Sequence, residues 1–394
     1  MTTNSVSLKS SIYKLIKFFV IAMGGIALSG QAQAQAIELL ASKRQAPAWQ
    51  RVALQHNAQP FEFAVYANHD LSETDFNIKE IVIVLHGVSR NGNDYFASAQ
   101  STLNQVRPDQ TNILLVSPQF VAPQDQASGF TGLPTWAPNA WASGLDALTG
   151  PSGLSSYDAM DELLLTLADK NKYPSLRKVV LAGHSAGGQL VHRYAVLNQI
   201  DARIRKSGID LQYVVANPSA FMYFTKDRPI SDTSFGPFDG QAACPNYDQY
   251  RYGTRDIIHF GAGLSAPVLL ERYLSRRVTY LMGTADNNPS QDNLDKTCAA
   301  KAQGSTRIQR ARRYVAYERF VATPFTFINH DAYEVIGIGH NQSGMFQSTC
   351  AVKVLFGAEV TANSVSATCE YKPAQPVKAQ PVIVPEMVET STGP

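Results

Sequence analysis

The sequence predicts an α/β fold, with a mostly parallel central sheet flanked by helices. Short apolar runs rich in β-branched residues alternate along the chain with segments of helical periodicity, as in strands joined by crossover helices. Residues 177–192 contain both in succession: an apolar run, a glycine-rich turn and a helical pattern. Between the two ends of the chain, about 330 residues remain, enough for one large domain.

Individual elements follow from these patterns. We expect strands at 62–66, 81–85, 113–117, 178–182, 213–216, 278–282 and 333–338. The clearest helices are expected at 93–106, 157–169 and 188–198. In the second of these, apolar side chains share one face and acidic residues fill the first turns, which suits the helix dipole.

Two long stretches, 118–154 and 219–262, lack periodicity and carry many aromatic residues. Long irregular segments in a compact domain are usually functional loops, so we expect walls or a lid over a site. The alternative is that the aromatic side chains anchor these loops to the body of the domain.

The N-terminus has the pattern of a secretory signal peptide. Lys9, Lys14 and Lys17 form a basic region, residues 18–28 are apolar, and Ala-Gln-Ala-Gln-Ala at 32–36 offers small-residue cleavage sites. We therefore expect residues 1–36 to be removed near Ala34 or Ala36, and the mature protein to be secreted or periplasmic. The alternative is an uncleaved membrane anchor, but the apolar stretch is short for a span, and we expect no stable membrane insertion.

Composition and charge indicate a globular domain without a nucleic-acid partner. The chain is 44% hydrophobic and 17% charged. Cleavage removes three of the 34 Lys and Arg residues and no acid, which leaves 31 basic and 32 acidic residues and a net charge of −1. Such a balance gives no electrostatic reason to bind nucleic acid. We expect the mature part to consist of one large α/β domain at 37–372 and a flexible Pro-rich tail at 373–394.

The four cysteines of the chain predict two disulfides. An even number in an exported protein is typical of paired cysteines, and three pairings are possible. We favour Cys244–Cys298 and Cys350–Cys369, because the second pair brackets one short C-terminal segment. The alternative, a zinc site, lacks a C-x-x-C motif or a histidine pair, so we expect no metal.

Ser185 is the candidate nucleophile. It is the centre of a G-x-S-x-G motif, residues 183–187, which lies between a predicted strand and a predicted helix. At such a turn the serine adopts strained backbone angles that raise its hydroxyl above the sheet, and glycines allow the close approach of neighbouring chain.

A serine hydroxyl needs a histidine base, and the histidine needs a carboxylate to fix its tautomer. Only His340 follows a strand after the nucleophile, in the loop beyond 333–338. Asp286 ends the turn after the strand at 278–282, one unit earlier. Its alternatives are Asp292, Asp295 and Asp256.

Two backbone N–H groups should stabilise the negative oxygen that the attack creates. Ala186 follows the nucleophile directly. Val88 follows His86-Gly87 at the end of the strand at 81–85, where the glycine allows a tight turn. We therefore expect Val88 and Ala186 to form the oxyanion hole.

Four blocks, Leu85-His-Gly87, Gly183-His-Ser-Ala-Gly187, Gly283-Thr-Ala-Asp286 and Gly339-His340, resemble in this order those of the α/β-hydrolase superfamily. The resemblance covers residues 61–356 and extends to secreted bacterial and fungal serine hydrolases near the polyester-depolymerase and esterase branches. Unlike short-chain esterases with a His-Gly-Gly-Gly block, this chain has Val88 and Ser89 after Gly87, which favours a single-glycine oxyanion loop.

These observations predict an exported serine hydrolase that cleaves carboxylic esters through an acyl-enzyme, without a cofactor. The substrate would be a small-molecule or polymeric ester. Three alternatives use the same scaffold: a peptidase or amidase, a polyester depolymerase, and a catalytically silent binding protein. The complete Ser, Asp and His set argues against the last.

Overall fold

A computed structural model describes residues 49–108, 111–322, 327–360 and 366–372 of the chain. The predicted signal peptide (1–36) and tail (373–394) lie outside the described residues and stay predictions. No helix in the described part is both long and apolar enough to cross a membrane.

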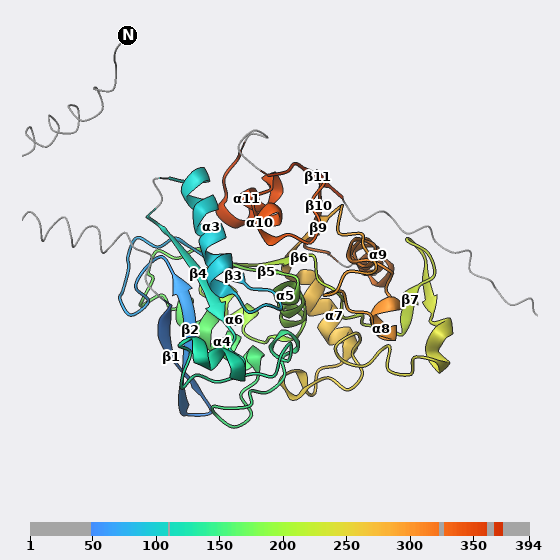
Figure 1. Cartoon of the computed structure of the whole chain (residues 1–394), viewed down its shortest axis with the longest axis horizontal. Helices are drawn as coiled ribbons and strands as arrows, with labels where there is room; N and C mark the ends of the chain where they lie inside the picture. Colours follow the sequence, from blue (N-terminus) through green and yellow to red (C-terminus); the bar gives the residue numbers. More distant parts are fainter. Residues whose placement is uncertain (1–48, 109–110, 323–326, 361–365, 373–394) are drawn as a thin grey trace, which may run out of the picture. The chain divides into compact units, whose positions relative to one another are not determined.

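The domain is built on a nine-stranded sheet with the order β1-β2-β4-β3-β5-β6-β9-β10-β11 (Figure 1). The six central strands β4, β3, β5, β6, β9 and β10 pair in parallel with their neighbours in that order. Strands β1 and β2 at one edge and β11 at the other are antiparallel. A separate antiparallel pair is formed by β7 and β8. This confirms the predicted α/β class with a mostly parallel sheet. The strands are β1 Gln50–His56, β2 Gln59–Ala67, β3 Glu80–Leu85, β4 Ile113–Gln119, β5 Lys178–His184, β6 Asp210–Ala216, β7 Asp227–Pro229, β8 Phe235–Pro237, β9 Arg277–Gly283, β10 His330–Val335 and β11 Cys369–Tyr371.

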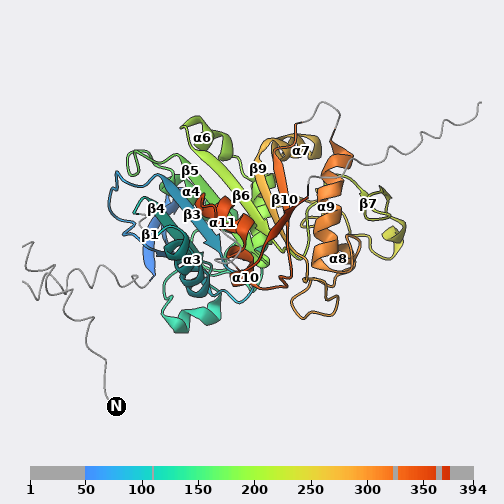
Figure 2. The ribbon, with the colours of Figure 1, turned by 90° about the horizontal axis from the view of Figure 1, so that it is seen from above.

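Helices cover both faces of the sheet (Figures 1 and 2). Side chains alternate between the faces along each strand, so Ile81 and Ile83 of β3 enter one core while Val82 and Val84 enter the other. The first core is closed by α4 Ser156–Leu167, α5 Ala186–Leu197, α7 Ala266–Ser275 and α9 Arg307–Val321, and the second by α3 Gly92–Val106, α10 Gln342–Phe346 and α11 Thr349–Phe356. Two short helices, α6 Asp201–Lys206 and α8 Cys298–Lys301, complete the set within the described residues.

Helix α4 illustrates why the predicted helices form where they do. Ser155 caps it by accepting from the Asp158 backbone N–H, and the Asp158 side chain accepts in return from Ser155. This capping box satisfies two N–H groups that the helix itself cannot pair. Met160, Leu163 and Leu167 then lie on the buried face.

The structure differs from the sequence-based expectations at several elements. The last core strand begins at His330 and ends at Val335 rather than covering 333–338, because Gly337 turns the chain with a φ of 75°. Strands β1 and β11 and helix α9 were not predicted. In α9 the apolar residues Ile308, Ala311 and Val315 share the buried face with Arg307, Arg310 and Glu318, which weakens the apolar periodicity of the sequence.

Candidate active site

Ser185 lies at the sharp turn between β5 and α5. Its φ of 60° and ψ of −119° are strained for a residue with a side chain. The Ser185 N–H donates to the Ala216 carbonyl at 3.0 Å, which ties the turn to the neighbouring strand β6. The strain therefore holds the residue in one orientation at the carboxyl edge of the sheet.

The two motif glycines are required by close backbone approach. A Cβ on Gly183 would lie 2.3 Å from the Gly187 backbone, and a Cβ on Gly187 would lie 2.6 Å from the Leu85 and His86 carbonyl oxygens. Any larger residue would push α5 away from β3. The glycines thus set how closely Ser185 approaches the loop after β3.

Ser185, His340 and Asp286, together called the triad, form a continuous hydrogen-bonded series. The His340 Nδ1 atom lies 2.7 Å from Asp286 Oδ2, and His340 Nε2 lies 2.9 Å from Ser185 Oγ. A carboxylate only accepts hydrogen bonds, so Nδ1–H donates to Asp286 and Nε2 accepts from the serine hydroxyl. The structure therefore brings together the three side chains that the sequence singled out.

The alternative carboxylates do not orient His340, because its two ring nitrogens bond Asp286 and Ser185. Asp286 is 3% exposed and follows β9 by three residues. Asp256 pairs with Arg255 on another loop. Asp295 accepts from the Tyr252 hydroxyl at 2.7 Å, and Asp292 lines the pocket beside Ser185.

Arg307, which the sequence analysis missed, contacts the second oxygen of the triad carboxylate. Its Nη1 atom lies 3.4 Å from Asp286 Oδ1, and both side chains are almost fully buried, at 1% and 2% exposure. Burial lowers the pKa of Arg307 while Asp286 opposes this change, and a guanidinium stays charged in proteins. A permanent positive charge thus lies beside the triad.

His184 packs behind the catalytic histidine candidate. The ring centroids of His184 and His340 are 4.6 Å apart. Burial, together with the charges of His340 and Arg307, lowers the pKa of His184 well below its usual value. This ring is therefore neutral, and its Nδ1 lies 3.3 Å from the Tyr95 hydroxyl.

A second neutral histidine, His86, supports the loop that carries Val88. The Phe120 N–H donates to His86 Nε2 at 3.0 Å, so Nδ1 carries the proton and donates to the Gly87 carbonyl at 2.9 Å. Burial lowers the pKa of His86 to about 4, which keeps the ring in this neutral form. Val88 and Ala186 line the same pocket as Ser185.

The pocket at Ser185 has a volume of about 290 Å³ and a mainly polar lining. Its apolar members are Val88, Ala142, Ala186 and Leu294. The polar members are Asn139, Ser143, Ser185, Gln189, Ser219, Arg251, Asp292, Asn293 and Asp295. Both irregular stretches, 118–154 and 219–262, contribute to these walls. Their large aromatic side chains, such as Trp136, Trp141, Phe221 and Tyr223, are instead buried at 0% exposure.

Two buried arginines hold the pocket walls. Arg193 donates to Ala142 O, to Arg251 O and to the Gln189 side chain, and we call these three lining residues the α5 wall. Arg307 donates to Ser219 Oγ at 3.0 Å and to Asn293 O at 2.5 Å, and we call these two residues the α9 wall.

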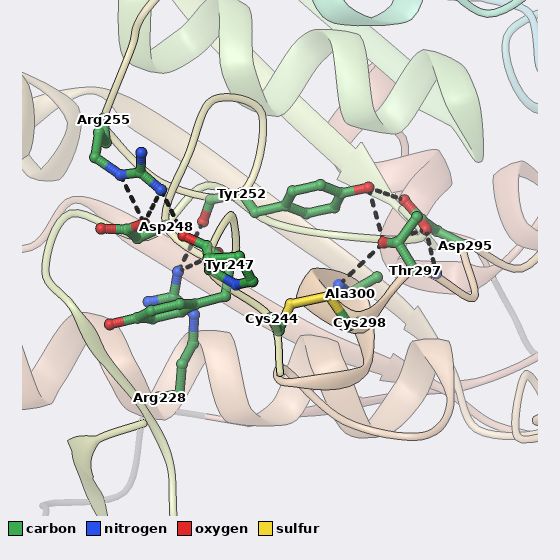
Figure 3. The surroundings of a disulfide bond; sticks show 11 residues. Arg228, Cys244, Tyr247, Asp248, Tyr252, Arg255, Asp295, Thr297, Cys298 and Ala300 are labelled. Carbon is green, nitrogen blue, oxygen red and sulfur yellow. Dashed lines mark hydrogen bonds and ion pairs between the residues drawn. A yellow bond between two sulfur atoms is a disulfide. The ribbon is translucent and has the colours of Figure 1, made fainter. Parts of the chain in front are cut away.

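The disulfides are Cys244–Cys298 and Cys350–Cys369. The first joins the 219–262 stretch to the segment that follows the pocket residues Asp292 to Asp295. Around it, Tyr252 donates to Asp295 and Thr297 donates to Tyr252, so both segments are also linked by hydrogen bonds (Figure 3). Among the described residues, no three His, Cys, Asp or Glu side chains are grouped so that they could hold a metal ion.

Comparison with known proteins places this geometry in a known fold. No protein-family model matches the chain, and no curated protein matches its sequence. The chain is similar in structure to LpqC, a poly(3-hydroxybutyrate) depolymerase from Bordetella parapertussis, with a TM-score of 0.56 and 25% identity, covering 82% of this chain and 96% of that chain. The chain has the α/β-hydrolase fold. A second structure to which the chain is similar, poly(aspartic acid) hydrolase-1 from Sphingomonas sp. KT-1, has a TM-score of 0.53 and 20% identity over 79% of this chain and 99% of that chain.

Proposed function

We propose that this α/β-hydrolase is an exported serine esterase that cleaves carboxylic esters through an acyl-enzyme. The observation that carries the proposal is the hydrogen-bonded triad, with 2.9 Å between His340 and Ser185 and 2.7 Å between His340 and Asp286. It opens onto a pocket that Val88 and Ala186 also line. Nucleophile, base and orienting carboxylate thus meet beside two candidate oxyanion donors.

The proposed reaction has two halves. Ser185 Oγ attacks the ester carbonyl carbon while His340 Nε2 takes the hydroxyl proton, and the Val88 and Ala186 N–H groups donate to the negative carbonyl oxygen. His340 then gives this proton to the leaving alcohol as the ester C–O bond breaks. Water then attacks the acyl carbon while His340 takes one of its protons, and His340 passes that proton to Ser185 Oγ as the bond between the acyl group and the serine breaks and the carboxylic acid leaves. Asp286 holds the tautomer of His340 in both halves.

The pocket favours esters with a short, polar acyl or alcohol group. Its volume of about 290 Å³ is at the lower end of ligand pockets, and its hydroxyl, amide and charged groups would be left unpaired by a long alkyl chain. LpqC is named for a polyester of hydroxy acids. Short oligomers of hydroxy acids therefore suit the pocket, and a polyester depolymerase is one form of the proposed activity.

A panel of p-nitrophenyl esters with graded acyl chains tests the proposal, together with hydroxy-acid oligomers and a polyester film. We expect kcat/KM to be highest for the shortest chains and to fall by at least about tenfold from C4 to C12 acyl groups. Ser185→Ala should abolish each activity. Cleavage of aminoacyl anilides at comparable rates would instead favour a peptidase, and a rising profile with chain length would contradict the assigned substrate class.

Export is part of the proposal. Disulfides form and persist in oxidising compartments, and the chain carries two. N-terminal sequencing of the mature protein should give a start after Ala34 or Ala36. A mature protein that still begins at Met1 would contradict cleavage.

A further inference from the structure

Arg307, the first residue of α9, contacts one oxygen of the triad carboxylate, and His340 contacts the other. Asp286 Oδ2 accepts from His340, and Asp286 Oδ1 lies 3.4 Å from Arg307 Nη1. The backbone of the same aspartate accepts from the Ile308 N–H at 3.2 Å. Helix α9 therefore holds both the carboxylate and the main chain of Asp286.

Arg307 also reaches two residues of the pocket wall. Its Nε donates to Ser219 Oγ at 3.0 Å and its Nη2 to Asn293 O at 2.5 Å, and Nη1 also bonds the Gln291 side chain. One planar guanidinium thus fixes the α9 wall and the triad carboxylate in a single geometry. A lysine could supply the charge but not this set of directed bonds.

We propose that Arg307 is a positioning residue that sets the basicity of His340 through Asp286. This inference rests on the proposed function. The proton that His340 accepts from Ser185 binds at Nε2 and makes the imidazole positive, while Nδ1–H stays bonded to Asp286. The fixed positive charge of Arg307 beside Asp286 disfavours the positive imidazole, so His340 stays free to accept the Ser185 proton down to a lower pH.

The other charged or titratable groups around the triad do not replace Arg307. His184, against the ring of His340, is neutral because burial lowers its pKa. Asp295 forms an ion pair with Arg251 and accepts a hydrogen bond from the Tyr252 hydroxyl. Arg310 lies almost one turn along α9 and donates to the Gly304 and Ser219 carbonyls, and none of its hydrogen bonds goes to Asp286.

The test measures the acid limb of the kcat/KM profile in three variants. Arg307→Met removes the charge and should raise the apparent pKa of this limb by about one pH unit. Arg307→Lys keeps a charge but loses the directed bonds, so kcat should fall about tenfold while the limb moves much less. Arg310→Met is the matched control: it removes a buried arginine from the same helix and should leave the limb in place.

A second measurement needs no substrate. The His340 imidazole pKa, followed by NMR in a Ser185→Ala background, should rise on Arg307→Met by the same amount as the kinetic limb. An unchanged His340 pKa in Arg307→Met, or an equal rise in Arg310→Met, would overturn the inference. Ester hydrolysis that survives Ser185→Ala would instead contradict the proposed function, so the two failures are distinguishable. If Arg307→Met does not fold, Arg307→Gln, which retains hydrogen-bonding capacity without the charge, serves the same comparison.

Discussion

Each of the two walls of the Ser185 pocket is held by a buried arginine, yet only one of these arginines contacts a triad side chain. Arg193, 0% exposed, joins Ala142, Gln189 and Arg251 into the α5 wall. Arg307, 1% exposed, joins Ser219 and Asn293 into the α9 wall and also contacts Asp286. Arg193 therefore supports the pocket wall alone, whereas Arg307 supports the pocket wall and also contacts the triad carboxylate.

Because only Arg307 contacts Asp286, we expect the two arginines to affect different kinetic constants. The hydrogen bonds of Arg193 go to pocket residues and to no triad residue, so removing this side chain should mainly change binding. Arg307 bonds both residues of the α9 wall and also Asp286, which orients His340. Removing this side chain should therefore change substrate binding and proton transfer together. Asp286 links the two effects because it contacts both Arg307 and His340.

The largest effect is expected from Asp286→Asn. The amide can donate to His340 and favour the wrong tautomer, and it leaves Arg307 buried without a charged partner. We expect kcat to fall by about 10⁴-fold. Steady-state ester kinetics measure this, with circular dichroism as the check that the variant folds. A loss smaller than about tenfold would remove Asp286 from the account.

Arg193→Met should separate the two walls. It leaves the Ala142 and Arg251 carbonyls and the Gln189 amide without their donor, which we expect to lower the free energy of unfolding by about 3 kcal/mol and to raise KM. The acid limb of kcat/KM should stay in place, unlike that of Arg307→Met.

A matched control is Arg276→Met. Arg276 donates to Ala195 O at 2.5 Å and to Asn198 O at 2.6 Å, at the far end of α5 from Ser185. This variant should lose comparable stability, measured by urea unfolding, but keep its KM. Equal KM changes in both variants would mean that the α5 wall has no specific role.

The smallest effect on ester hydrolysis is expected from the contact between α4 and α5, which bears on stability. Burial raises the pKa of Asp161 to about 7, and Tyr194 of α5 donates to it at 2.5 Å. The folded state binds this proton more tightly than the unfolded state, so its contribution to stability is present at low pH and is lost as pH rises from about 4 to 7. Asp161→Asn should remove this decline, a difference of about 4 kcal/mol between pH 4 and pH 8. Parallel stability–pH curves for the two proteins would contradict the prediction.

The sequence was most informative where one pattern brings distant residues to one place. Ser185, Asp286 and His340 each follow a strand, and carboxyl ends of parallel strands meet at one edge of a sheet. The motif glycines and the order of the three residues therefore predicted their meeting from local patterns alone. Their catalytic roles stay predictions.

The walls could not be predicted in the same way. They are held by single side-chain bonds from Arg193 and Arg307 to carbonyls far along the chain, which leave no periodic signal. Helix α9 was missed because buried charged residues interrupt the apolar stripe that identifies a helix. Strand β11 has only three residues and pairs with β10 at the edge of the sheet. Three residues are too few to show the alternation of apolar and polar side chains that indicates a strand.

The most direct test of the account is covalent labelling of the nucleophile. The folded protein is treated with a fluorophosphonate probe, and the modified residue is located by mass spectrometry. The account predicts one label, on Ser185, that disappears in Ser185→Ala and forms far more slowly in His340→Ala. A folded protein that takes no label, or a label retained in Ser185→Ala, would contradict it.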